Sequence, residues 1–204
     1  ECIDPNFGFS RYAERLGQSA NAFDELYDSL QNKPTFIDNL TLAILEDKLK
    51  TVQPKLICFS VPFPGNLYSA FRCAQFIKAN YPEIKIAIGG GFPNTELRQV
   101  TDTRVFDFFD FITLDDGELP IELLHQNVCQ PNNNKSNSET NIENKDQNSN
   151  NNGRAERSRS TTINVDLNSK EKQYKRTFLL EDGKVVYKNN TTRPDYKQLQ
   201  VGTP

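Results

Sequence analysis

The chain has 204 residues, a net charge of −3 and a mean hydropathy of −0.67. Residues 1–129 hold 11 basic and 18 acidic residues, whereas the rest of the chain holds 13 basic and 9 acidic ones. The acidic first part argues against a nucleic-acid-binding surface, and no apolar run approaches the ~20 residues that a membrane span needs. With no signal-peptide pattern at the start, we expect a cytoplasmic protein that binds neither nucleic acid nor membrane.

The first elements expected along the chain are two helices, at residues 19–31 and 34–50. Thr35 and Asp38 have the spacing of a capping box at the start of the second helix. The apolar stripe expected to face the core of that helix consists of Ile37, Leu40 and Ile44.

Three strand–helix units follow, each with a short apolar run before a helical pattern. The strands are predicted at residues 55–61, 84–88 and 111–114, and the helices at 66–81, about 94–100 and 119–126. The first strand is apolar almost throughout, which is typical of a strand buried on both faces. Strands that alternate with helices at this spacing predict an α/β fold with a parallel sheet and right-handed crossovers. Ligands of such sheets bind beyond the carboxyl ends of the strands.

The second part of the chain has a different composition. Residues 130–173 contain no aromatic residue and are rich in Asn, Ser and Lys, so we expect a disordered linker. Asp182-Gly183 separates two apolar runs and predicts a β-hairpin, which should pack on another element because a lone hairpin is marginally stable in water. The expected divisions are an α/β domain at 1–129, the linker at 130–173, and the hairpin with an extended segment at 174–204.

The four cysteines, at positions 2, 58, 73 and 129, match neither a zinc site nor a disulfide framework. Cys58 falls in an expected strand and Cys73 in an expected helix, so both are predicted to be small buried side chains in a reducing compartment. His125 and Cys129 are four residues apart and could share a helix face, but one such pair is weak evidence for a metal site. We assign no metal ligand and no catalytic residue.

Three loops should meet at the carboxyl edge of the sheet: 60–65, 89–94 and 115–118. Three consecutive glycines in the second loop either let a ligand approach the backbone or simply make a tight turn, and they do not form a dinucleotide fingerprint. Ser60 can bond a ligand or cap its own loop. The carboxylates of the third loop can act on a ligand, although Glu118 can equally favour the positive end of the following helix.

Taken together, Phe59-Ser60-Val61-Pro62, Gly89-Gly90-Gly91 and Leu114-Asp115-Asp116-Gly117-Glu118 resemble the cobalamin-binding domain that precedes the barrel of many bacterial radical SAM enzymes. The resemblance spans residues 56–124. It implies a flavodoxin-like sheet with the corrin ring over its carboxyl edge and the nucleotide tail between loops. The implied cobalamin-binding residues are Ser60, Val61, Pro62, Gly65, Gly89, Gly90, Gly91, Phe92, Asn94, Asp115, Gly117 and Glu118.

The resemblance also implies partners outside this chain. A radical SAM barrel of the same parent protein would hold a [4Fe–4S] cluster on a Cys-x₃-Cys-x₂-Cys motif and would cleave S-adenosylmethionine, with cobalamin serving methyl transfer or a related radical reaction. No three cysteines here have that spacing. We therefore expect the motif downstream of Pro204 and the first strand of the domain upstream of Glu1. His125 is expected to lie away from the corrin and not to bind cobalt.

Two other classes of protein compete with this interpretation. A phospho-receiver module shares the sheet but needs a phosphoacceptor Asp where Ser60 stands, and a Lys near Glu118. A plain interaction domain with a disordered tail is the third possibility.

Overall fold

The structure, a computed structural model, describes residues 23–130 and 171–195. The disorder predicted for 130–173 falls almost wholly outside these residues, as does the beginning of the helix predicted at 19–31. No helix in the described residues is long and apolar enough to cross a membrane.

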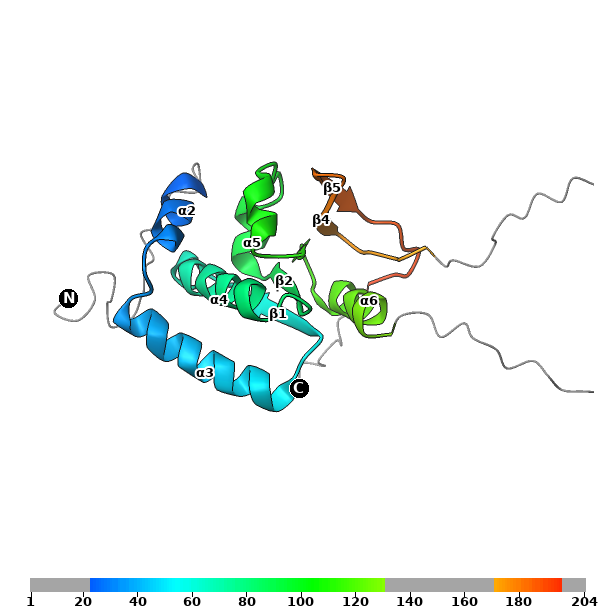
Figure 1. The fold of residues 1–204 in the computed structure, drawn as a ribbon. Coiled ribbons are helices and arrows are strands. Elements are labelled where there is room, and N and C mark those ends of the chain that lie inside the picture. The colour runs from blue at the N-terminus through cyan, green and yellow to red at the C-terminus, as the bar shows by residue number, and fades with distance from the viewer. Residues whose placement is uncertain (1–22, 131–170, 196–204) are drawn as a thin grey trace, which may run out of the picture. The chain divides into compact units, whose positions relative to one another are not determined.

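A single five-stranded sheet runs through the described residues in the order β1-β2-β3-β4-β5 (Figure 1). Its strands are β1 (Leu56–Ser60), β2 (Lys85–Gly89), β3 (Phe111–Thr113), β4 (Thr177–Glu181) and β5 (Lys184–Lys188). The first three strands are parallel and the last two antiparallel. The expected α/β class and parallel strands are thus confirmed, in a mixed sheet.

The predicted hairpin is present and forms β4 and β5. Asp182 and Gly183 make its turn with φ of 49° and 72°, the left-handed backbone that Asp-Gly turns favour. The hairpin packs, as expected, on another element: β4 pairs with β3 through Phe178 opposite Ile112. The sheet therefore crosses the boundary expected between the α/β domain and the segment 174–204.

The helices are α2 (Phe23–Gln31), α3 (Phe36–Val52), α4 (Leu67–Asn80), α5 (Gly91–Glu96) and α6 (Glu118–Cys129), with 3₁₀ turns η1 (Pro64–Asn66) and η2 (Thr103–Asp107). The α-helices lie close to their predicted ranges except α5, and the two 3₁₀ turns were not predicted. Helix α5 begins at Gly91, about three residues early. Gly90, with φ of 106°, turns the chain directly after β2, and Pro93 is tolerated because first-turn N–H groups have no helical partner.

Alternating side chains of the strands divide the core between the two faces of the sheet. On one face, Ile86, Ile88 and Ile112 pack with Phe71 and Ile77 of α4, and α2 and α3 lie against the same helix (Figure 1). The opposite face carries a smaller cluster with α6, made by Ala87, Leu124, Tyr174 and Leu179.

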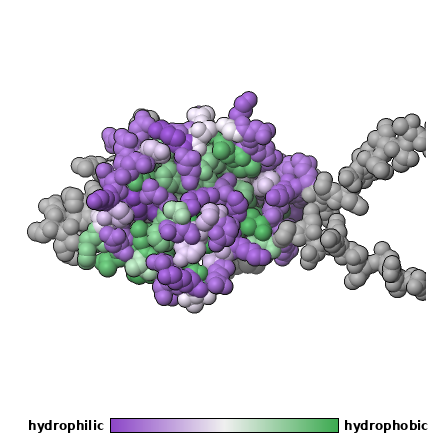
Figure 2. All heavy atoms as spheres, viewed as in Figure 1, coloured by the Kyte–Doolittle hydropathy of each residue, from purple (hydrophilic) through white to green (hydrophobic). Residues whose placement is uncertain are grey.

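Helix α3 has the predicted capping box but buries a different face. The N–H of Asp38 donates to Thr35 Oγ1 at 3.2 Å, and the N–H of Thr35 donates to the Asp38 carboxylate at 3.0 Å. The expected core stripe is wrong at Leu40 and Ile44, which are 50% and 65% exposed. Apolar surface is visible on the α3 side of the molecule in Figure 2. The helix instead buries Asp38, together with Leu42 and Leu49.

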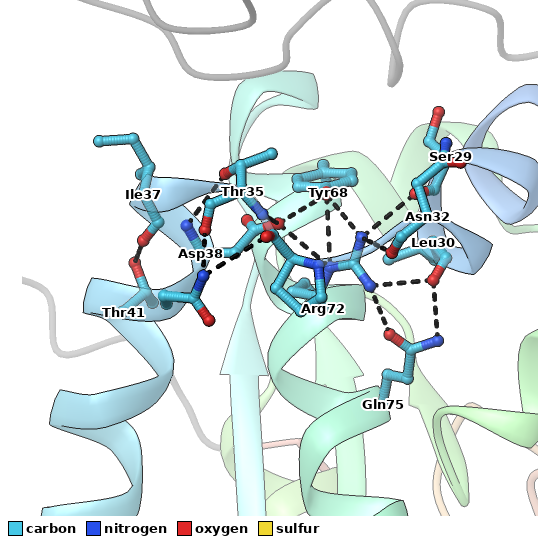
Figure 3. Close-up of polar contacts among 12 residues, drawn as sticks. Ser29, Leu30, Asn32, Thr35, Ile37, Asp38, Thr41, Tyr68, Arg72 and Gln75 are labelled. Carbon is cyan, nitrogen blue, oxygen red and sulfur yellow. Dashed lines mark hydrogen bonds and ion pairs between the residues drawn. The ribbon is translucent and has the colours of Figure 1, made fainter. Parts of the chain in front are cut away.

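Asp38 can be buried because its negative charge is paired with the positive charge of Arg72 of α4, which is buried beside it (Figure 3). The Arg72 guanidinium lies 3.3 Å from the Asp38 carboxylate and donates to the carbonyls of Leu30 at 2.9 Å and Ser29 at 3.1 Å. Tyr68 donates its hydroxyl to Asp38 at 2.9 Å. Arg72 thereby satisfies carbonyls at the end of α2 and connects α2, α3 and α4. We call Asp38, Tyr68, Arg72 and the carbonyls they hold the helix anchor.

The two cysteines predicted to be buried differ. Cys73 is buried, and burial raises the pKa of its thiol to about 11. Cys58 is exposed, so that expectation is wrong. Within the described residues β1 pairs with β2 alone, and the strand is only partly buried rather than covered on both faces.

Candidate functional site

Three segments, called loops below, lie at the carboxyl ends of the parallel strands: residues 60–66 from the end of β1 through η1, residues 89–94 from the end of β2 into α5, and residues 114–118 from the end of β3 to the start of α6. Parallel strands end at one edge of a sheet, and this edge is where ligands of open α/β sheets bind. We call these loops together the carboxyl-edge site. It contains every cofactor-binding residue that the resemblance implies.

The first two loops are fastened to each other through their backbones. The N–H of Val61 donates to the Gly89 carbonyl at 2.8 Å, and the N–H of Phe92 donates to the Val61 carbonyl at 3.0 Å. The side chains of Val61 and Phe92 are 1% and 7% exposed and belong to the core. These two residues therefore support the site from within rather than presenting side chains to a ligand.

The three consecutive glycines are required by packing inside the protein. A Cβ would lie 2.5 Å from Thr113 Oγ1 at Gly89, 2.9 Å from the Val61 backbone at Gly90 and 2.8 Å from the Pro62 carbonyl at Gly91. Gly90 also has a φ of 106°, which side chains disfavour. Of the two interpretations of the triplet, the tight turn is sufficient to explain all three glycines.

The third loop is joined to the second by Asp115. Its backbone has a φ of 59°, and its N–H donates to the side-chain oxygen of Asn94 in α5. Its carboxylate pairs with Arg98, which lies just after α5. These contacts give Asn94 and Asp115 a role in joining two loops.

Arg176, just before β4, reaches the same loop from the hairpin side. It donates to the carbonyls of Leu114 at 3.3 Å and Asp116 at 3.0 Å, and to the carboxylate of Asp195 at 2.8 Å. Its side chain is only 13% exposed and lies 3.6 Å from the Asp115 carboxylate. The hydrogen bond from Arg176 holds the pKa of Asp195 below its usual value.

Sequence reasoning missed Arg98 and Arg176. Arg98 lies in a polar stretch with no motif, and Arg176 is separated from the third loop by about sixty residues. No local pattern reports such a contact. The positive φ of Arg176, 44°, becomes visible only in the structure.

Gly117 differs from the glycine triplet because the fold does not need it. Its φ of −78° and ψ of −14° suit any residue, and a Cβ would make an ordinary contact, 3.5 Å from Ile121 Cδ1. Gly117 precedes Glu118, the first residue of α6, and both Asp116 and Glu118 are exposed. A group that approaches the edge at Gly117 therefore reaches the backbone without an intervening side chain.

The remaining predicted residues lie at the surface of the same edge. Ser60 and Pro62 are exposed and Gly65 is partly exposed. His125 is exposed in the middle of α6, away from the start of that helix. In residues 23–130 and 171–195, no three His, Cys, Asp or Glu side chains gather closely enough to hold a metal ion.

Comparisons of the chain with protein-family models, with curated proteins and with solved structures find no match.

Proposed function

We propose that the carboxyl-edge site binds cobalamin and that the chain is the cobalamin-binding module of a larger, cytoplasmic radical SAM enzyme. The observation that carries this proposal is the joining of the three loops at one edge of the parallel strands, by the bonds of Val61 with Gly89 and of Asp115 with Asn94. The sequence resemblance over residues 56–124 supplies the identity of the ligand.

The polar groups at the edge suit the chemistry of cobalamin. Its corrin ring is fringed with uncharged amide side chains, which need hydrogen-bond acceptors and donors rather than a strong opposite charge. Ser60 offers a hydroxyl, and the exposed carboxylates of Asp116 and Glu118 accept amide N–H groups. The charge of Asp115 is already balanced by Arg98 and Arg176.

Gly117 is where the proposed ligand approaches the backbone most closely. The carbonyl of Gly117 accepts the N–H of Ile121 at 2.9 Å, whereas the absence of a side chain leaves the backbone N–H of Gly117 open to approach. Neither backbone angle nor packing in the protein requires glycine here. A ligand that occupies the space of the missing side chain explains the choice of residue.

The residues of this chain bind and orient the cofactor, and none of them is assigned a catalytic step. Bound cobalamin supplies methyl transfer, or a related radical reaction, in a parent enzyme whose barrel holds the [4Fe–4S] cluster and S-adenosylmethionine. The barrel of the same parent chain is thus the partner that this module serves.

Equilibrium dialysis of the purified chain against hydroxocobalamin tests the proposal. A Gly117→Asn variant keeps a residue that helix N-caps prefer but fills the space beside the backbone, so we expect cobalamin affinity to fall at least tenfold with the unfolding midpoint unchanged. Gly183→Asn, in the hairpin turn, is the matched control and should bind as the unaltered chain does. The proposal is wrong if the unaltered chain binds no cobalamin, or if Gly117→Asn binds it equally well.

A further inference from the structure

Phe63 is the most exposed of the large apolar side chains in the described residues, at 69%. It lies in the loop between β1 and η1, within the carboxyl-edge site. The nearby Phe92 of the second loop is, by contrast, 7% exposed and part of the core. The site therefore combines exposed polar groups with one large apolar side chain that the fold leaves outside.

The backbone holds Phe63 in this position on both sides. Its neighbours Pro62 and Pro64 have fixed φ angles, and a residue before proline is restricted to extended backbone. Phe63 has that conformation, with φ of −138° and ψ of 158°. Its carbonyl accepts the N–H of Asn66 at 3.1 Å, and Val61 is bonded to the second loop.

An aromatic side chain has few rotatable bonds, and on a restricted backbone it loses little freedom when a ligand covers it, so more of its burial energy goes into binding. Single exposed apolar residues are common on proteins. Phe63 differs from these because of its two prolines and its place at the edge that binds ligands in such sheets. Its uncharged, flat ring matches a ligand that is itself broad, flat and apolar on its face.

We propose that Phe63 is the apolar contact for the face of the corrin ring, while Ser60, Asp116 and Glu118 meet its amide fringe. This inference rests on the proposed function and deepens it. It assigns the ligand's apolar face to the first loop, at a residue that is not among the cobalamin-binding residues implied by the sequence resemblance.

The first experiment compares cobalamin affinity, measured by equilibrium dialysis, for Phe63→Ala and Val52→Ala. Both side chains are about two-thirds exposed, but Val52 ends α3 ahead of β1 and thus lies at the amino side of the sheet. Loss of a buried aromatic contact should weaken binding roughly tenfold for Phe63→Ala. Val52→Ala should leave the affinity unchanged.

The second experiment uses the absence of tryptophan from the chain. Phe63→Trp and Val52→Trp each introduce a single emitter, and cobalamin absorbs where tryptophan emits. We expect Phe63→Trp to retain its affinity and lose most of its emission on titration with hydroxocobalamin, and Val52→Trp to lose distinctly less.

The outcomes separate the two proposals. In one outcome the unaltered chain binds cobalamin, Phe63→Ala binds it with equal affinity, and both tryptophans are quenched equally. This outcome overturns the role of Phe63 and leaves the proposed function standing. The same holds if Phe63→Ala abolishes self-association of the chain without changing cobalamin affinity, because Phe63 is then a dimer contact. No binding by the unaltered chain overturns both.

Discussion

The helix anchor and the carboxyl-edge site are both organised by an arginine that holds backbone carbonyls and a carboxylate. Arg72 holds the carbonyls of Leu30 and Ser29 and the carboxylate of Asp38, and it is 4% exposed. Arg176 holds the carbonyls of Leu114 and Asp116, and its carboxylate partner Asp195 is exposed.

The difference between the two lies in what surrounds the charge. Arg72 and Asp38 are both removed from water, so either one without the other leaves a buried charge unpaired. Around Arg176, water can replace a lost partner, so its contacts fix the geometry of a loop more than they stabilise the fold. The anchor is therefore expected to determine stability, and the carboxyl edge to determine binding.

The largest effect is expected at the anchor. Arg72→Met removes the guanidinium from the buried carboxylate of Asp38, and the free energy of unfolding should fall by about 3–5 kcal/mol. Urea denaturation measures this. Lys50→Met, which breaks an exposed pair with Glu46, should not shift the unfolding midpoint measurably. A similar small effect for Arg72→Met would mean that the anchor does not carry the stability assigned to it.

A smaller loss of stability is expected when Gly90 is substituted, because this residue lies at the carboxyl edge but is required there by packing and backbone conformation. Gly90→Ala combines a positive φ with a Cβ 2.9 Å from the Val61 backbone, so unfolding should become easier by roughly 2–3 kcal/mol. Gly183→Ala has a positive φ but no neighbour within 4 Å and should cost only about 1 kcal/mol. Equal losses at both positions would show that packing at Gly90 is not tight.

The smallest change in stability is expected at Arg176. Arg176→Ala removes hydrogen bonds in partly solvated surroundings, at about 1 kcal/mol. The third loop should nevertheless loosen, so the amides of Asp116 and Gly117 should exchange with solvent faster, while those of α4 should not. Unchanged exchange at Asp116 and Gly117 would show that Arg176 does not position this loop.

Local patterns were enough to predict most of the elements. The strands, α4 with its buried apolar side, the capping box of Thr35 and Asp38, and the Asp-Gly hairpin turn all depend on residues close together in the sequence. The loops of the candidate site were located for the same reason, since each follows a predicted strand.

The errors come from contacts between distant residues. The face that α3 buries is set by Arg72, 34 residues beyond Asp38, and this buried pair outweighs the exposure of Leu40 and Ile44. The exposure of Cys58 depends on which strands pair with β1. The contacts of Arg176 with the third loop likewise depend on the fold, and no residue pattern within the loops predicts them.

Nuclear magnetic resonance of the ¹⁵N-labelled chain, titrated with hydroxocobalamin, tests most directly whether the three loops form one binding site. We predict that the amide signals of Gly89–Gly91 and of Asp115–Glu118 shift together and saturate at one ligand concentration, with the signal of Phe63 among them and those of the last turn of α3 unmoved. Signals that do not shift at cobalamin concentrations that saturate binding, or shifts confined to α3 or the hairpin turn, would contradict the account.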